Sequence, residues 1–312
     1  MTQLNRRSLL GAAAAASAAT ALTPFAALQV QAQAAGFHRY KVGSHEVIVV
    51  HDGSSSFKLP DNFVANKSRD EVNAAWVAMS QQADQIVVPY SPIVVNTGSK
   101  TVVIDTGRGA AGQFQENLKA AGIDAGQVDM VIISHFHGDH INGLIDKVGK
   151  QAFAKAEVLV PAAEFKYFMD DAELNKQTTD RMKGVFAGAR KVFDALNRKV
   201  TQYEAGKEVA PGITSVSTPG HTPGHMSFVI ASGNAKVFVQ SDVTNIPLFA
   251  RNPGFHIMFD QDAQMAEATR HKVYDMVVAE KLPLQGFHYP FPALARIEKS
   301  GSGYLEIPMT AV

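Results

Sequence analysis

The stretch MVIISHFHGDH, residues 130–140, carries the strongest signal for fold and chemistry in this chain. Its first four residues form a short apolar run bounded by polar residues, which is typical of a buried strand. Residues two apart in an extended segment share a face, so His135 and His137 can point at one metal ion. A turn after His137 can then swing Asp139 and His140 toward a second ion. Imidazole and carboxylate ligands suit zinc, and also iron or manganese.

Two metal ions need more ligands than this run supplies, and the candidates downstream all sit at predicted strand ends. His221 lies in a turn after a strand, Asp242 follows another strand, and His288 ends a third. Loops at strand ends commonly carry function on a rigid scaffold. His225 competes with His221, and we expect one of the two to bind metal and the other to support the loop. Asp105 also ends a strand, and we expect it to orient a ligand histidine rather than bind metal itself.

The remaining pattern predicts a mixed α and β chain whose second half repeats the order of elements in the first. Strand and hairpin signals fall at residues 47–50, 93–95, 101–104, 130–133, 158–160, 213–216, 228–230, 237–239 and 284–287. Helices are predicted at about 69–82, 112–121, 171–197 and 261–281. Strands grouped with helices in two similar halves indicate two sheets sandwiched between helices.

Composition excludes several classes of protein. The 312 residues contain no cysteine, so disulfides, thiolate zinc sites and a cysteine nucleophile are excluded. Residues 1–34 hold an arginine pair, Arg6 and Arg7, then an Ala-rich apolar stretch and a small-residue cleavage pattern at 32–34. This pattern predicts a twin-arginine export signal and a periplasmic or secreted bacterial protein without stable membrane insertion after cleavage. The remaining residues 35–312, predicted to be one hydrolase domain, would carry 27 basic and 29 acidic residues, which gives no electrostatic footprint for nucleic acid.

On these motifs the sequence resembles the metallo-β-lactamase superfamily, whose defining run is H-x-H-x-D-H. Residues 135–140 complete that run, 105–107 match the upstream D-T-G, and 218–225 match T-P-G-H-T-x-G-H, in which the first histidine is the ligand. The resemblance implies an α/β fold, a four-layer αβ/βα sandwich of two mixed sheets flanked by helices. It also implies two zinc ions per chain, one held by His135, His137 and His221, the other by Asp139, His140 and His288, with Asp242 as the bridge.

Within the superfamily the chain looks most similar to secreted methyl-parathion-hydrolase-like and lactonase-like members. The opening residues 36–43 and the segment 287–292 carry that similarity. Acyl-homoserine lactonases place a tyrosine three residues after the bridging aspartate, where this chain has Asn245. True β-lactamases generally lack the bridging aspartate, so Asp242 argues against that activity.

The expected function is therefore that of a di-zinc hydrolase acting on an ester, lactone or phosphotriester bond of a small-molecule substrate. A hydroxide between two metal ions would attack the substrate, and we expect Asp139 to pass a proton to the leaving group. Two alternatives stay open: a mono-iron oxidoreductase on the same fold, and a metal-binding protein without turnover. A homodimer is a further expectation that the sequence leaves open.

Aromatic side chains fall in three segments that we expect near a substrate pocket, although most of them should belong to the core. They are Phe57, Trp76, Phe165, Tyr167, Phe168, Phe186, Phe249 and Phe255.

Overall fold

Two seven-stranded sheets dominate the computed structural model, which describes residues 36–312. The predicted export signal at residues 1–34 lies outside the described residues. The first sheet has the order β1 (Phe37–Val42), β2 (His45–Val50), β5 (Ile93–Asn96), β6 (Thr101–Ile104), β7 (Met130–Ile132), β8 (Glu157–Pro161) and β9 (Thr201–Tyr203). The second runs β10 (Glu208–Ala210), β11 (Ile213–Ser217), β12 (Met226–Ser232), β13 (Ala235–Ser241), β14 (Leu284–Gly286), β15 (Leu294–Ser300) and β16 (Gly303–Pro308).

Both sheets mix parallel and antiparallel pairs. In the first sheet β6, β7, β8 and β9 run parallel, and the strands before them pair antiparallel. In the second sheet only β13 and β14 pair in parallel. The carboxyl ends of β7, β11, β13 and β14 carry the loops that hold the candidate ligands, so strands of both sheets position the site.

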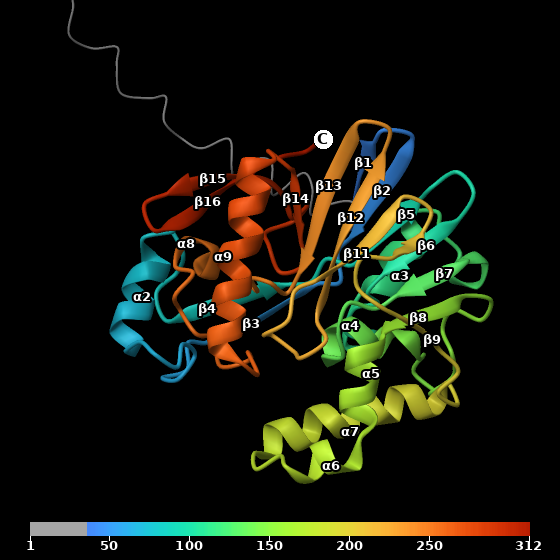
Figure 1. The fold of residues 1–312 in the computed structure, drawn as a ribbon, viewed down its shortest axis with the longest axis horizontal. Helices are drawn as coiled ribbons and strands as arrows, with labels where there is room; N and C mark the ends of the chain where they lie inside the picture. Colours follow the sequence, from blue (N-terminus) through green and yellow to red (C-terminus); the bar gives the residue numbers. More distant parts are fainter. Residues whose placement is uncertain (1–35) are drawn as a thin grey trace, which may run out of the picture.

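Helices cover the outer face of each sheet (Figure 1). They are α2 (Arg69–Val77), α3 (Phe114–Ala120), α4 (Gly138–Ile141), α5 (Ala162–Met169), α6 (Asp171–Asn175), α7 (Asp180–Ala195), α8 (Pro247–Arg251) and α9 (Ala263–Ala279). Single 3₁₀ turns lie at η1 (Gly109–Ala111), η2 (Ala125–Gln127) and η3 (Asn142–Leu144). None of the helices in the described part of the chain is long and apolar enough to span a membrane.

Side-chain alternation along buried strands explains the four layers. In β2, Val47 and Val49 join the apolar cluster between the two sheets, whereas Ile48 and Val50 face the helices α3, α5 and α7 on the other side. A strand buried on both faces reads as a continuous apolar run, as this one does. A third cluster, which includes Val273 of α9, covers the outer face of the second sheet. The αβ/βα sandwich predicted from the sequence is therefore confirmed.

Three regions differ from the sequence prediction. The helix expected to reach Gln82 ends at Val77, and Ser80 and Asp84 adopt left-handed backbone angles that a helix excludes. The single helix expected at 171–197 is split into α6 and α7, where Thr179 caps the second helix. Residues 54–90 also contain a small separate sheet, β3 (Ser54–Lys58) paired with β4 (Gln85–Pro89).

Candidate metal centre

Seven candidate ligands converge from four loops at one edge of the sandwich. His135 and His137 follow β7, and Asp139 and His140 lie in the short helix α4 directly after them. His221 comes from the loop between β11 and β12, Asp242 follows β13, and His288 follows β14. The structure thus brings together every residue that the sequence singled out as a ligand, in three overlapping groups of potential metal ligands.

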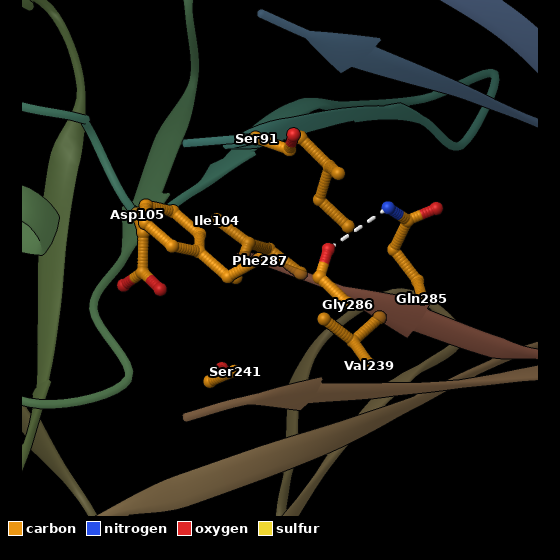
Figure 2. A pocket seen from close by; sticks show the side chains of 9 residues that line it. Ser91, Ile104, Asp105, Val239, Ser241, Gln285, Gly286 and Phe287 are labelled. Atoms are coloured by element: carbon orange, nitrogen blue, oxygen red, sulfur yellow. Dashed lines mark hydrogen bonds between the residues drawn. The ribbon is translucent and has the colours of Figure 1, made fainter. Parts of the chain in front are cut away.

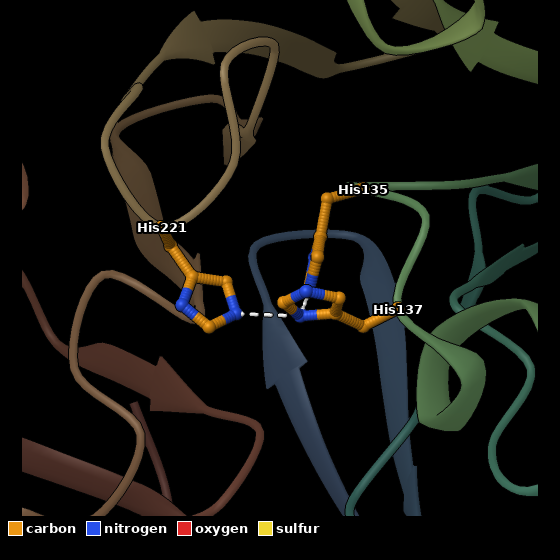
Figure 3. Close-up of side chains that lie close together, drawn as sticks. All are labelled: His135, His137 and His221. Carbon is orange, nitrogen blue, oxygen red and sulfur yellow. Dashed lines mark hydrogen bonds between the residues drawn. The ribbon is translucent and has the colours of Figure 1, made fainter. Parts of the chain in front are cut away.

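The first group consists of three histidines, His135, His137 and His221, which we call the three-histidine group. Nε2 of His135 lies 3.2 Å from Nδ1 of His137, and that same Nδ1 lies 2.8 Å from Nε2 of His221. Figure 3 shows the three rings turned toward one another, with His221 reaching across from a different loop. Three imidazole nitrogens facing a common point form one face of a tetrahedral zinc site.

The second group consists of Asp139, His140 and His288, which we call the mixed group. Oδ2 of Asp139 lies 3.4 Å from Nε2 of His288 and 3.8 Å from Nε2 of His140. The Asp139 side chain keeps 27% of its surface exposed, whereas those of the two histidines are almost fully buried. Asp139 therefore faces solvent from within the cluster.

Asp242 lies between the two groups. Its Oδ1 is 3.3 Å from Nε2 of His140, and its Oδ2 is 3.3 Å from Nε2 of His221 and 3.2 Å from Nε2 of His288. The amide of Asn245 donates a 2.8 Å hydrogen bond to the same Oδ2. A single carboxylate thus reaches histidines of both groups, which is the placement that a bridging ligand requires.

The outward-facing ring nitrogens of three candidate ligands each lie close to a different polar group. Nδ1 of His140 lies 2.8 Å from the Asp105 carboxylate, and Nδ1 of His135 lies 3.0 Å from the hydroxyl of Ser134. Nδ1 of His288 lies 2.8 Å from the carbonyl oxygen of Pro89. Such partners fix the tautomer and the orientation of a ligand ring. His137 is the exception, because its buried Nε2 has no hydrogen-bond partner among the described residues.

Asp105, which the sequence predicts to orient a ligand histidine, contacts His140 and Ser134. It adopts a left-handed backbone conformation with φ of 58°, and its carboxylate accepts hydrogen bonds from the amide and the hydroxyl of Ser134. Because Ser134 also contacts His135, this one carboxylate orients His140 directly and His135 through one intermediate.

The rings of His221 and His225 point to different surroundings. His221 belongs to the three-histidine group, whereas His225 lies outside all three groups. Nε2 of His225 accepts a 3.0 Å hydrogen bond from the backbone amide of Asp242, and its Nδ1 lies 2.9 Å from the hydroxyl of Thr218. His225 therefore holds the backbone that presents Asp242.

Asp260 and Arg270 were not found from the sequence. Oδ1 of Asp260 lies 2.9 Å from Nδ1 of His221, and Oδ2 accepts a 3.1 Å hydrogen bond from Arg270. Both side chains are buried, and the Arg270 guanidinium also donates to the backbone carbonyls of Pro253 and Phe255. No motif in the sequence marks Asp260, which lies in a loop 39 positions after His221.

Burial and charge divide the histidines into two kinds. Burial, with the neighbouring imidazoles, lowers the pKa of His135 and of His137 well below the usual value, so both rings are neutral and ready to bind metal. Burial also acts to lower the pKa values of His140 and His288, but the nearby carboxylates, chiefly Asp242, outweigh it and raise both. Burial would raise the pKa of Asp242, but these two histidines hold it well below its ordinary value.

The donor set fits a divalent metal. Nε2 of His140 and Oδ1 of Asp242 are buried, face the centre of the cluster and have no aligned hydrogen-bond partner in the described chain. Leaving buried polar atoms without partners costs about 1–3 kcal/mol each. A cation bound between them would satisfy both, and nitrogen and carboxylate donors are the ligands that zinc takes when thiolates are absent.

A small cavity of about 10 Å³ lies behind the site, between the two sheets (Figure 2). The buried hydroxyls of Ser91 and Ser241 line it and have no hydrogen-bond partner within residues 36–312. The full lining is Ser91, Ile93, Ile104, Asp105, Val239, Ser241, Gln285, Gly286 and Phe287. This volume suits about one water molecule, so the cavity is too small to bind a substrate.

The remaining histidines and the aromatic residues singled out in the sequence lie elsewhere. His38, His45, His51, His256 and His271 belong to none of the three ligand groups. Trp76, Phe168, Phe186 and Phe249 are buried in apolar clusters, and Phe57, Phe165, Tyr167 and Phe255 pack partly buried against the same clusters. These aromatic side chains are core residues, as expected for most of them.

Comparison with known proteins agrees with this architecture. The family profile described as Metallo-beta-lactamase superfamily matches residues 87–282. The chain belongs to the metallo-beta-lactamase superfamily, and this places it among the metal-dependent hydrolases.

Several relatives within the superfamily are lactonases. An N-acyl homoserine lactonase from a Bacillus species is 26% identical over 210 residues, which cover 61% of this chain and 73% of that protein. A second from Bacillus thuringiensis is 26% identical over 171 residues, 49% of this chain and 60% of its own length. The chain therefore spans between three fifths and three quarters of these relatives.

Two solved structures share the whole fold. The dizinc quorum-quenching lactonase AidC superposes with a TM-score of 0.82 at 23% identity, covering 88% of this chain and 97% of AidC. The hydrolase AbOPH superposes with a TM-score of 0.81 at 24% identity, covering 88% of this chain and 98% of AbOPH.

Proposed function

We propose that this protein is a di-zinc hydrolase that cleaves an ester, lactone or phosphotriester bond in a small molecule. The observation that carries the proposal is the position of Asp242, whose two oxygens lie within 3.3 Å of histidines from both ligand groups. Sites with two ions hold them about 3.5–4 Å apart, a spacing that one shared carboxylate can span.

His135, His137 and His221 would hold one zinc, Asp139, His140 and His288 the other, and Asp242 would bind both. Bound zinc supplies a water-derived nucleophile at neutral pH and polarises a carbonyl or phosphoryl oxygen. The chain's own part is to hold these ligands rigidly. Asp105 and Asp260 fix the His140 and His221 rings, and Asn245 and His225 fix the Asp242 side chain and backbone.

Asp139 is the proposed proton carrier to the leaving group. Its partly exposed side chain is the only carboxylate of the mixed group, and a carboxylate can pass a proton when it lies within hydrogen-bond reach of the reacting atoms. An Asp139→Asn variant that has been reloaded with zinc to the wild-type content should still lose activity. Full activity at unchanged metal content would contradict this role.

The lactonase relatives make acyl lactones the first substrates to test. Asn245 stands where acyl-homoserine lactonases have a tyrosine, and its amide donates a hydrogen bond to Asp242. We therefore keep aryl esters and aryl phosphotriesters in the panel.

The test is hydrolysis of an acyl lactone, an aryl ester and an aryl phosphotriester by the purified protein, before and after chelation. The proposal predicts turnover of at least one member, loss with chelator and recovery with zinc. Turnover that resists chelation, or redox activity with one iron per chain, would overturn it.

We also propose that residues 1–34 direct export through the twin-arginine route to the periplasm or beyond. The arginine pair and the cleavage pattern at 32–34 support this. Cell fractionation of the wild type and of a variant with both arginines replaced by lysine tests it. Equal export of the two would contradict the route.

A further inference from the structure

Glu164 is a buried carboxylate outside the ligand set. It is the third residue of α5, a position where acidic side chains usually face solvent and interact with the helix terminus. Here the residue is fully buried, with a relative exposure of 0%. Glutamate is almost never fully buried unless it is paired, so its contacts require an explanation.

The two carboxylate oxygens of Glu164 contact two different loops. Oε2 accepts a 3.1 Å hydrogen bond from the amide of Phe136, which lies between His135 and His137. Oε1 accepts a 2.7 Å hydrogen bond from the amide of Gly224, in the loop that presents His221. One side chain thus joins the backbones of the two loops that supply the three-histidine group.

Close packing fixes this arrangement. A Cβ placed on Gly224 would lie 2.5 Å from the backbone nitrogen of Glu164 and 2.9 Å from the Cβ of Ala163, so only glycine allows the loop to lie directly on the first turn of α5. One backbone hydrogen bond, from the amide of Met226 to the carbonyl of Ser134, also joins the two loops. The Glu164 carboxylate and this backbone hydrogen bond therefore together connect the two histidine loops, which belong to different halves of the chain.

The connection serves one ligand group more than the other. The three-histidine group takes His135 and His137 from one of the two loops that Glu164 contacts, and His221 from the other. The mixed group takes Asp139 and His140 from α4 and His288 from the end of β14, which Glu164 does not touch. A change in the separation of the two loops would therefore disturb the first group most.

We propose that Glu164 is a positioning residue that sets the separation of the two histidine loops and thereby the metal affinity of the three-histidine group. This inference rests on the proposed di-zinc function. It adds that Glu164, which lies far from the candidate ligands in sequence, supports the metal affinity of the three-histidine group and not that of the mixed group.

Stability and metal affinity should respond differently to loss of this carboxylate. Glutamine has the same shape, but its single oxygen can accept from only one loop, and its NH₂ group faces the other amide donor. Burying an ionised carboxylate costs desolvation free energy that the neutral glutamine avoids, and this offsets the hydrogen bond that one loop amide loses. Glu164→Gln should therefore weaken the site without weakening the fold.

The experiment titrates zinc into zinc-free wild type and Glu164→Gln protein in competition with a chromophoric chelator. Hydrogen exchange at residues 134–138 and 218–226 is measured on the same samples. Glu164→Asp is the second variant, because it keeps the charge but is one methylene too short to reach both amides. Leu118→Ala, which removes a buried side chain of α3, is the control for general destabilisation.

We expect Glu164→Gln to bind one zinc with wild-type affinity and the other roughly 10- to 100-fold more weakly, the range for groups that support metal ligands. Exchange at Gly224 should be faster even without zinc, and Leu118→Ala should lose stability while keeping both affinities. Unchanged zinc affinities in Glu164→Gln, or equal weakening of both, would overturn the inference. A wild type that binds fewer than two zinc ions would contradict the di-zinc function, and the exchange data would still decide whether Glu164 joins the loops.

Discussion

The three-histidine group and the mixed group differ in charge and exposure, although each takes residues from loops of both sheets. The three-histidine group contains only imidazoles, its His135 and His221 are buried, and its members come from loops of both sheets. The mixed group includes a carboxylate, Asp139, that keeps 27% of its side-chain surface exposed. In the proposed di-zinc enzyme, the first group would anchor one metal ion and the second would present the other to substrate.

The supports behind the two groups differ as well. His221 of the first group is backed by the buried Asp260–Arg270 pair. In the mixed group Asp105 backs His140, and a backbone carbonyl backs His288. Because Asp105 also reaches His135 through Ser134, it supports both groups, whereas Asp260 supports only the first. Substitutions can therefore separate the two groups or damage both.

The largest expected effect comes from removing the carboxylate that the two groups share. Asp242→Ala should lose metal from both groups, because His140, His221 and His288 all lie within 3.3 Å of its oxygens. Activity should fall by more than the 10- to 100-fold loss typical of residues that merely support ligands. Metal analysis and hydrolysis rates check this, and a variant that retains one tightly bound zinc would show that Asp242 is not shared.

A second prediction uses the pH dependence of the unfolding free energy to test the buried Glu164 carboxyl, which joins the loops of the three-histidine group. Burial raises the pKa of Glu164 to about 7, although hydrogen bonds from Gly224 and Phe136 act to lower it. Between its unfolded pKa near 4.5 and about 7 the folded zinc-free protein binds one more proton than the unfolded chain, so rising pH destabilises it. Relative to Glu164→Gln, the wild type should lose about 3 kcal/mol of unfolding free energy across this window, at 1.36 kcal/mol per pH unit.

Denaturant unfolding of zinc-free wild type and Glu164→Gln at a series of pH values measures that difference. The other titrating groups are common to both proteins, so their contributions cancel. A stability difference that stays constant from pH 4 to 8 would contradict the assignment.

A matched pair of substitutions sharpens the comparison between the supports. Asp260→Asn should weaken zinc binding at the three-histidine group roughly 10- to 100-fold and leave the mixed group unchanged. Asp105→Asn should weaken both, because its carboxylate contacts His140 and Ser134 together. Stepwise zinc titration distinguishes the two patterns. Identical titrations for the two variants would contradict the proposal that Asp260 supports one ligand group and Asp105 supports both.

The smallest expected effect lies away from both groups. Ser68 caps α2 in a reciprocal arrangement with Glu71, and Ser68→Ala should cost about 1 kcal/mol of unfolding free energy. Zinc affinity and kcat should not change. A loss of metal in this variant would mean that the α2 region is coupled to the site.

The ligands could be predicted from the sequence because four of them fall within six residues directly after an apolar strand. Asp242 and His288 were found for a related reason, since each directly follows a strand. Asp260 and Glu164 could not be found, because each acts on a residue 28 to 60 positions away and has the ordinary sequence context of a loop or a helix start.

The helices and strands also divide into those that could be predicted from the sequence and those that could not. Long apolar strands such as β2 were predicted, because burial on both faces leaves a continuous apolar run. The polar strand β3, SSSFK, carries no such run, and it pairs with β4 only after 26 intervening residues. The break between α6 and α7 was missed because the intervening residues are polar, as are much of both helices.

The most direct test of the account is the zinc stoichiometry of the purified wild-type protein beside Asp242→Ala and Asp260→Asn. The account predicts about two zinc ions per wild-type chain, both lost in Asp242→Ala, and one weakened in Asp260→Asn. A wild type that binds a single metal ion at saturation, or an Asp242→Ala variant that keeps one or both ions tightly bound, would contradict the shared two-metal centre.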